Sequence, residues 1–519
     1  MVNKFKLINA AGLLAAVVLS ALTVSCVKSE DLAGSTMDGF VSFGSDELTV
    51  SDLSTGVSLV GLGVELDPHF LSQNVTRGDG ATELDWKRTV VKRCTYMGVQ
   101  RYRVMVLPNW WEPYNDDDDP DNFNWDKFTF DSKEMQSLYA VLDLAEDTGA
   151  DVTLVLWGCH IAANTLELGN LGRHFLADEG SNWVTGTKDA EEFAESFTAL
   201  LKYLVETKGY TCIEELTPYN EPDGNTTSFS NYARDCRALD SKLKAEGLRS
   251  SVKLNLSDNI DTDRNWLYAT ASGLGHIADL FNSHTYIFGY ETPNSKMIEW
   301  ERSNIEAANM GGRNHFIGEF GSNQTQGATR QRDINLYERG VLLTREVVNF
   351  LNAGAVGASY WSLIDQYYLR YEAYAQMQQL GLWIYKNNAY QAADLGGIKG
   401  DYTCRPQYYA YSTLLRFIRK GSRVYPIDTD NEFVAATAVR TAEGEWTYVI
   451  ANGSDENMNY ELKNEAEGGM KDCDVYQYVK GGLPKDDSLL EPIMSLKGGE
   501  KGFRLHVPAN SVLVLTQIK

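Results

Sequence analysis

Short apolar runs of β-forming residues alternate with longer helical segments over most of this 519-residue chain. In the helical segments apolar residues return every three or four positions, as they do on the buried face of a helix. Such alternation is typical of a parallel sheet whose strands are joined by crossover helices. The eight runs are 58–65, 100–107, 151–157, 215–220, 252–257, 280–286, 315–320 and 356–364. Eight such strands predict a (β/α)8 TIM barrel, with helices that include 83–96, 132–148, 190–207, 228–246 and 330–351.

The last hundred residues have a different pattern. Short strand-like runs are separated by Gly, Asn and Asp turns, which predicts a C-terminal antiparallel β-sandwich. The segment 40–50 alternates apolar and polar residues like an edge strand. The predicted organisation is a signal peptide at 1–25, a tether and N-terminal strand at 26–56, the barrel at 57–423 and the sandwich at 424–519.

The N-terminus has the layout of a secretory signal. Lys4 and Lys6 precede an apolar run over 7–24, and Ser25 stands before Cys26. The residues before Cys26 resemble a bacterial lipobox, which implies lipidation of Cys26 and a membrane contact through that lipid anchor only. The acidic stretch Ser29-Glu30-Asp31 resembles surface-export signals. The expected location is therefore the cell envelope, on the outer membrane with exposure at its surface. Secretion without a lipid is the alternative.

Charge and cysteine usage exclude several classes of function. The net charge of −24 and the absence of a clustered Lys/Arg stripe argue against a nucleic-acid partner, whereas an uncharged polysaccharide is compatible. The six cysteines after Cys26 lack the paired short spacing of a zinc site. We expect buried thiols or at most two disulfides, and no structural metal.

Two glutamates stand at the ends of predicted strands, 98 residues apart. Glu221 directly follows the fourth run and Glu319 lies near the end of the seventh, where a TIM barrel places its catalytic residues. A pair of carboxyl groups at a cleft can cleave a glycosidic bond, with one protonating the leaving oxygen and the other attacking the anomeric carbon or activating water. For a single strand-end glutamate, a solvated carboxylate or a helix cap is the alternative.

The motifs around both glutamates resemble those of clan A glycoside hydrolases. Asn220-Glu221-Pro222 is similar to the acid/base motif, and Gly318-Glu319-Phe320-Gly321 to the nucleophile motif. The appended sandwich is most similar to families 30 and 39, and the barrel more loosely to family 5. The resemblance implies retaining hydrolysis of β-linked oligosaccharides or polysaccharides without a cofactor, with Glu221 as acid/base and Glu319 as nucleophile.

The same resemblance implies roles for residues on other strands. Arg103 matches the arginine that holds the nucleophile ionised, although Arg101 has the same side-chain parity and competes for the role. Asn220 matches the residue that binds the sugar 2-hydroxyl. His284 and Tyr286 match a His-x-Tyr pair at the sixth strand end, where the tyrosine can donate to the nucleophile.

Aromatic and acidic residues at other strand ends are expected to line the cleft. Trp361 matches the tryptophan on which the clan's sugar ring packs. The less specific candidates are Glu65, Asp67, His69, Trp110, Trp111, Trp157, His160 and Asp258. A transglycosylase and a catalytically silent glycan-binding lipoprotein are the alternative functions, since both would share the barrel and the signal.

Overall fold

The computed structural model describes residues 46–68, 82–113, 119–156, 187, 189–224, 227–260, 264–323, 333–365, 379–384, 402–499 and 502–519. All of them belong to one compact unit, Phe43–Lys519. Outside the described residues lie Cys26, Trp157, His69, His160 and most of the tyrosine-rich segment 366–390, which the sequence predicts either as part of the sugar-binding wall or as packing under the sandwich. The predicted signal peptide, tether, lipidation site and domain boundaries therefore remain predictions.

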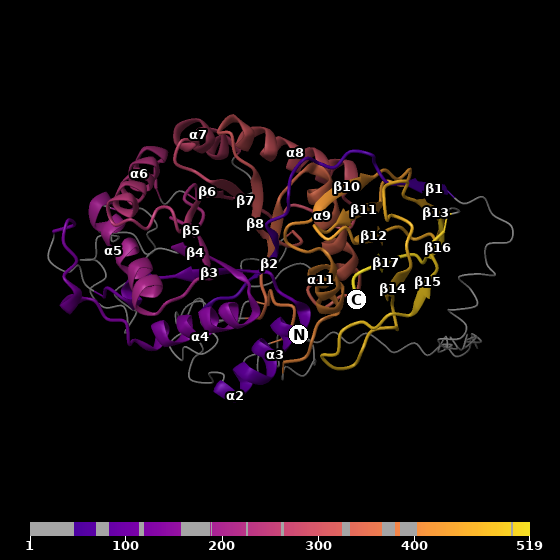
Figure 1. Ribbon diagram of the computed structural model, residues 1–519, viewed down its shortest axis with the longest axis horizontal. Helices are drawn as coiled ribbons and strands as arrows, with labels where there is room; N and C mark the ends of the chain where they lie inside the picture. The colour runs from indigo at the N-terminus through magenta and orange to yellow at the C-terminus, as the bar shows by residue number, and fades with distance from the viewer. Residues whose placement is uncertain are drawn as a thin grey trace, which may run out of the picture. The chain divides into compact units, whose positions relative to one another are not determined.

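Eight parallel strands close into a barrel, as the sequence pattern predicts (Figure 1). Each of the eight predicted runs overlaps a barrel strand, so the expected TIM barrel is confirmed. The strands are β2 (Gly61–Glu65), β3 (Arg101–Val106), β4 (Asp151–Leu156), β5 (Ile213–Thr217), β6 (Lys253–Asn259), β7 (Leu280–Thr285), β8 (His315–Phe320) and β9 (Gly357–Tyr360).

Helices connect these strands, and local sequence signals fix several of their ends. Ser132 and Ser228 cap two helices by accepting hydrogen bonds from the backbone amides three residues on. The helix after β8 begins later than predicted because residues 333–335 form a turn. The α-helices are α2 (Glu83–Asp85), α3 (Lys92–Met97), α4 (Lys133–Thr148), α5 (Ala190–Lys202), α6 (Phe229–Ala245), α7 (Arg264–Leu274), α8 (Asn294–Met310), α9 (Glu338–Ala353) and α11 (Pro406–Phe417). The predicted helix 83–96 consists of α2, a π-helical segment η3 (Trp86–Val91) and α3.

The C-terminal residues form the predicted sandwich of two sheets. One has the order β10-β11-β12-β17-β14-β15, and the other the order β1-β13-β16. The N-terminal strand β1 belongs to the sandwich and pairs in parallel with β13, so the second sheet is not purely antiparallel as the sequence pattern predicts. The strands are β1 (Asp46–Thr49), β10 (Arg423–Ile427), β11 (Val434–Arg440), β12 (Trp446–Asn452), β13 (Met458–Lys463), β14 (Cys473–Tyr478), β15 (Met494–Leu496), β16 (Phe503–Val507) and β17 (Ser511–Thr516).

The sandwich packs against barrel helices α9 and α11 (Figure 1). The rings of Tyr337 and Tyr478 stack with centroids 4.6 Å apart, and each hydroxyl donates to the backbone oxygen of the other residue. Aromatic packing and satisfied hydroxyls make this a close interface. The sandwich therefore covers one side of the barrel.

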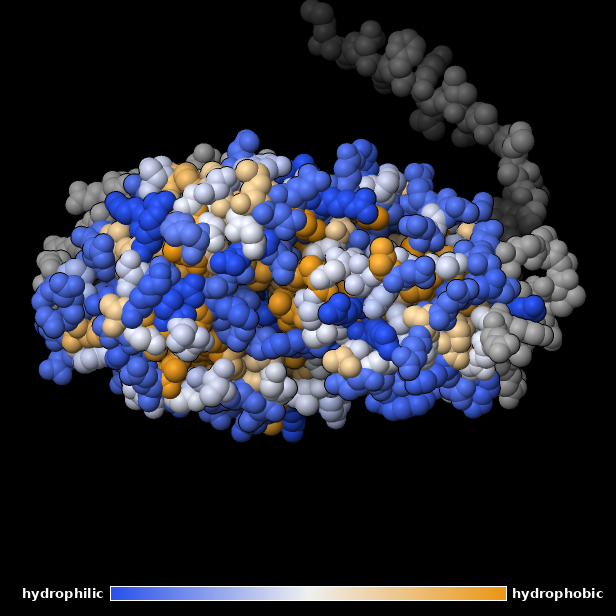
Figure 2. Space-filling view, turned by 45° about the horizontal axis from the view of Figure 1, so that its top comes forward, coloured by the Kyte–Doolittle hydropathy of each residue, from blue (hydrophilic) through white to orange (hydrophobic). Residues whose placement is uncertain are grey.

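No helix in the described part of the chain is both long and apolar enough to cross a membrane. Figure 2 shows a face that is largely hydrophilic, with hydrophobic residues in small areas. The five described cysteines, Cys94, Cys212, Cys236, Cys404 and Cys473, are free thiols, four of them buried. Burial raises the pKa of the Cys94 thiol to about 12. This fits the expectation of structural thiols.

Candidate active site

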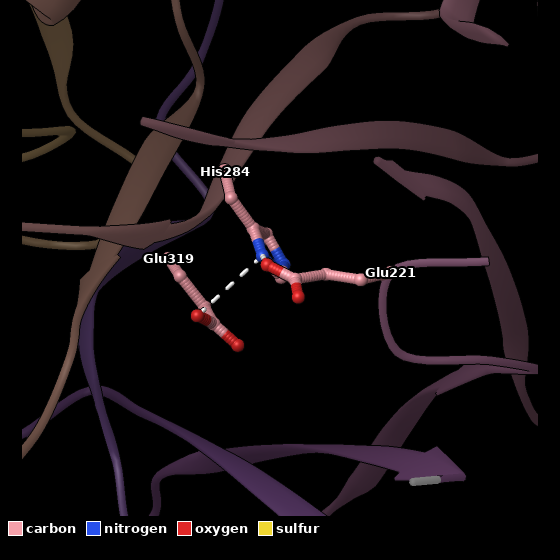
Figure 3. A group of neighbouring side chains, drawn as sticks. All are labelled: Glu221, His284 and Glu319. Carbon is pink, nitrogen blue, oxygen red and sulfur yellow. Dashed lines mark hydrogen bonds and ion pairs between the residues drawn. The ribbon is translucent and has the colours of Figure 1, made fainter. Parts of the chain in front are cut away.

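The two glutamates lie together at the carboxyl ends of the barrel strands (Figure 3). One oxygen of Glu221, one oxygen of Glu319 and a ring nitrogen of His284 all lie within 4.8 Å of one another. Glu221 follows β5 in a left-handed backbone conformation with φ 45°, a strained geometry for a residue with a side chain. Its side chain is 37% exposed, whereas that of Glu319 is 6% exposed. Glu221 is therefore the more accessible of the two.

Arg103 connects Glu319 with three other strand ends. Its Nη1 donates to Glu319 Oε1 at 2.6 Å and to Glu65 Oε2 at 3.0 Å. Its Nη2 donates to Asn220 Oδ1 at 2.9 Å and to Asp258 Oδ2 at 2.8 Å. The guanidinium is buried, so these charge-assisted hydrogen bonds are poorly screened. Arg103 thus brings together four groups from four different strand ends.

Arg101, the competing candidate, lies one layer deeper in the barrel. Its Nη1 is 2.9 Å from Glu215 Oε2 and donates to Thr153, and its Nη2 contacts Asp151. Two residues of a strand correspond to about 6.6 Å. Because of that displacement Arg101 contacts the carboxylates at the barrel floor, and Arg103 is the arginine that contacts Glu319.

Tyr286 and His284, the predicted pair after and within β7, both contact the glutamates. The Tyr286 hydroxyl donates to Glu319 Oε2 at 2.6 Å. His284 Nδ1 lies 2.8 Å from Glu221 Oε1 and 3.4 Å from Glu319 Oε2. The two carboxyl groups therefore share one histidine nitrogen.

Burial and charge have opposing effects on the ionisable groups. Burial raises the pKa of Glu319 above its ordinary value, although His284 and Arg103 act in the lowering direction. Burial likewise raises the pKa of Glu65 well above its usual range against the lowering effect of Arg103, which favours a neutral carboxyl there. Burial would lower the pKa of His284, but Glu319 and Asp258 raise it well above its usual value. Glu319 is thus surrounded by cations and a tyrosine donor.

Sequence reasoning gave no role to Asp223 and only a general one to Asp258. Both Asp223 carboxylate oxygens accept from the backbone amide of Ile260, at 3.0 and 3.2 Å. Burial raises the pKa of Asp223 to about 7, with Glu221 acting in the same direction. The position of Asp223 two residues after Glu221 was the only available signal. Its partner Ile260 belongs to another strand end, which the sequence does not connect to it.

Trp361 lies just beyond β9 and is 8% exposed. It packs in a small apolar cluster with Met105, Val155 and Leu380, against which Tyr286 also lies. The peptide bond between Trp361 and Ser362 is cis. The tryptophan is therefore next to Tyr286, while its role as a sugar platform remains a prediction. Trp157, which follows β4 in the sequence, lies outside the described residues.

Glu221, His284 and Glu319 also form the one group in the described chain that could offer three ligand atoms to a metal ion. Their surroundings are cationic, because the Arg103 guanidinium contacts Glu319 and the pKa of His284 is raised. Arg103 and Tyr286 already donate to both oxygens of Glu319. The donor set fits a paired carboxylate better than a cation site.

Comparisons with known proteins bear on the fold. No protein-family model matches the chain, and no curated protein matches it in sequence. A glycoside hydrolase family 30 subfamily 8 xylanase from Clostridium acetobutylicum is similar in structure, with 13% identity, a TM-score of 0.58, and 91% of this chain and 99% of that chain covered. An endo-β1,6-glucanase has 14% identity, a TM-score of 0.58, and coverage of 92% and 96%.

The chain shares its fold with family 30 glycoside hydrolases. A conserved exported protein from Bacteroides fragilis is also similar, with 13% identity, a TM-score of 0.62, and coverage of 91% and 100%. In each case the likeness extends over almost the whole of the other chain, barrel and sandwich together. The fold implied by the motifs around Glu221 and Glu319 is therefore confirmed.

Proposed function

We propose that this chain hydrolyses β-linked glycosides or polysaccharides with retention of anomeric configuration. The observation that carries the proposal is the close approach of the two carboxyl groups, of which one oxygen each lies within 4.8 Å of the other. Retaining enzymes separate their carboxyl groups by about 5–5.5 Å, whereas inverting enzymes leave about 6.5–9.5 Å for a water molecule. The spacing at Glu221 and Glu319 favours direct attack by a carboxylate.

The environments of the two glutamates support a division of roles. Glu319, held by Arg103 and Tyr286, would attack the anomeric carbon and form a glycosyl ester. Glu221, the more exposed, would give its proton to the departing glycosidic oxygen and then take a proton from the water that hydrolyses the ester. Asn220 Oδ1 accepts from Arg103, which would orient its amide toward the sugar 2-hydroxyl. This sequence of steps requires no cofactor.

The substrate class follows from the charge of the chain and from the named neighbours. A net charge of −24 disfavours polyanions such as nucleic acids. The similar structures include enzymes named as xylanases and an endo-β1,6-glucanase, which supports a neutral β-linked polysaccharide. Cleavage would take place in the cell envelope, with the protein held through a lipid on Cys26.

Replacement of each glutamate tests the proposal. We expect Glu319→Ala to lose activity on all glycosides, with azide restoring an inverted glycosyl azide. Glu221→Ala should keep partial activity on aryl glycosides whose leaving groups need no proton, and azide should give the retained product. Glu215→Gln, a buried carboxylate on the barrel floor, is the matched control and should keep both activities.

The product profile on a panel of plant, fungal and host β-glycans separates the related alternatives. Longer oligosaccharides formed from short ones would indicate transglycosylation through the same ester. Binding of a glycan without turnover by the wild-type protein would identify a silent binding protein. Equal loss of activity on natural and activated substrates in Glu221→Ala would contradict the acid/base role.

A further inference from the structure

The end of β6 contains an irregularity that changes the direction of one side chain. Leu254 and Leu256 are buried in the hydrophobic core, while Asn255 points into the barrel and bonds Glu215. Strict alternation would place Asp258 with the leucines, away from the barrel interior. Instead, the pairing register shifts between Ser257 and Asn259, and Ser257 and Asp258 have φ values of 84° and 49°. A bulge of this kind can redirect a side chain toward a site.

The redirected Asp258 carboxylate contacts both cations of the site. Oδ2 accepts from Arg103 Nη2 at 2.8 Å, and Oδ1 lies 3.2 Å from His284 Nε2. The backbone oxygen of Asp258 also accepts from the amide of Glu221 at 3.1 Å. Although burial acts in the raising direction, Arg103 and His284 lower the pKa of Asp258 below its ordinary value. The group is therefore an ionised acceptor, joined to Glu221 by its own backbone and through His284.

Strand β8, which is separated from β6 by β7, leaves room for this arrangement. A Cβ atom on Gly318 would lie 3.2 Å from Asp258 Oδ1 and 2.4 Å from Asn282 Oδ1. The second distance is far below an ordinary contact, so a larger residue at position 318 would displace the Asn282 side chain. The residue before Glu319 is thus small because Asp258 and Asn282 face it.

The protonation of His284 determines what it can do for Glu221. Two groups lie near Nε2, the Asp258 carboxylate at 3.2 Å, which accepts, and the Arg103 guanidinium at 3.4 Å, which donates. The nearer of the two is the acceptor, so we assign a hydrogen to Nε2. In a neutral ring Nδ1 would then carry no hydrogen and would accept a hydrogen bond from the protonated Glu221 carboxyl. That bond would point the Glu221 proton toward His284 and away from the substrate. A doubly protonated ring instead donates from Nδ1 to Glu221 Oε1 at 2.8 Å, which leaves the Glu221 proton on Oε2. Only the second state presents that proton to a leaving group.

We propose that Asp258 is a positioning residue, which acts through His284 to orient the carboxyl group of Glu221 for proton donation. The inference rests on the proposed function for its catalytic meaning, but the placement of Asp258, His284 and Glu221 stands on their contacts alone. Removal of the Asp258 charge would leave a neutral His284 and a misdirected Glu221 proton. Three other ionisable groups face His284 and Glu221 from the surrounding elements, namely Arg103, Glu319 and Asp223. Glu65 and Tyr286 contact Arg103 and Glu319 in turn.

Nitrogen NMR of histidine-labelled full-length protein tests the arrangement without any substrate. The chain has seven histidines, and the His284 signals are assigned by their absence in His284→Phe. At pH 7 we expect two protonated ring nitrogens in the wild type and one in Asp258→Asn. A neutral wild-type ring, or an unchanged doubly protonated ring in Asp258→Asn, would overturn the proposal. Since no turnover is needed, this result is independent of whether the protein proves to be a glycosidase.

Kinetics on the active enzyme tests the consequence. Asp258→Asn should lower kcat/KM for natural glycosides at pH 7 by about 10- to 100-fold, which is part of the about 10²–10⁴-fold that general acid catalysis contributes, because Glu221 itself remains. The basic limb of the pH profile should move to lower pH by about one unit or more, because His284 loses its proton more readily. Aryl glycosides that need no proton should be much less affected, a selectivity that general misfolding would not produce.

Two further variants distinguish a positioning role of Asp258 from a purely structural one. Asp258→Glu keeps the charge, so it should retain the doubly protonated ring and most of the basic limb. Glu215→Gln removes a carboxylate that is equally buried and also paired with an arginine, and should leave the pH profile unchanged. Equal shifts of the basic limb in Asp258→Asn and Glu215→Gln would refute a specific role for Asp258.

Discussion

The substitution Arg103→Lys tests whether the site needs the hydrogen-bonding geometry of the guanidinium or only its positive charge. The native side chain donates to four groups, Glu65, Glu319, Asn220 and Asp258, at 2.6–3.0 Å. Lysine keeps the positive charge but replaces the planar fork with one shorter ammonium group, which cannot reach all four acceptors. We expect the bond to Glu319 to be lost or lengthened.

The size of the effect follows from that one bond. A hydrogen bond to a charged group contributes about 1.5–3 kcal/mol, and one pKa unit corresponds to about 1.36 kcal/mol. The pKa of Glu319, which burial already raises, should therefore rise by about 1–2 units further. Because the nucleophile must be ionised, the acid limb of kcat/KM should move to higher pH by that amount. Activity on the acid side should fall by about 10- to 100-fold.

The assay is a pH profile of kcat/KM on an aryl β-glycoside, with thermal unfolding measured in parallel. Arg101→Lys is the matched control, because Arg101 is an equally buried arginine of the same strand that contacts Glu215 instead. Both variants should lose stability, but only Arg103→Lys should shift the acid limb. An unshifted limb in Arg103→Lys, or the same shift in Arg101→Lys, would refute the reasoning.

Three further predictions concern stability and location. The raised pKa of Asp223, about 7, means that its contribution to stability is present below its unfolded pKa, near pH 4, and is lost as the pH rises through 7. The unfolding free energy of Asp223→Asn relative to wild type should therefore increase as the pH rises from 4 to 8, by about 1–2 kcal/mol after allowance for partial exposure. A difference in urea unfolding that does not change with pH would contradict this. Asp365→Ala leaves the buried Arg405 guanidinium without its carboxylate and should lower the unfolding free energy by about 3–5 kcal/mol, whereas the exposed Lys497→Ala should change it little. Cys26→Ser should release the protein from the membrane fraction or leave its signal uncleaved, and a wholly soluble wild type with another mature N-terminus would count against lipidation.

Several features of the site could be predicted from the sequence because they depend on strand order alone. Once eight runs are recognised as parallel strands of a barrel, their carboxyl ends must meet at one face. Glu221, His284 and Glu319 follow or end such runs, so their proximity follows from the topology whatever the packing details. The motif resemblance added the roles proposed for them, including the hydrogen bond from Tyr286 to Glu319.

Other features depended on the register and depth of individual strands, which the sequence does not specify. Arg101 and Arg103 have the same side-chain parity, and only the closed barrel shows that Arg101 contacts Glu215 and Arg103 contacts Glu319. Asp258 has the parity of a core position, and a bulge with two left-handed residues turned it toward His284.

The sequence by itself thus determined the fold class and the face on which the chemistry-bearing residues gather, because hydrophobic periodicity and strand order are local properties of the chain. The tertiary structure decided which charges pair and which groups stay neutral. Those outcomes depend on distances of a few ångströms and on burial, as the opposing effects of burial and Arg103 on the pKa of Glu319 show. Electrostatic interactions of this kind fall off with distance and strengthen away from water, so they become fixed only when the barrel has closed.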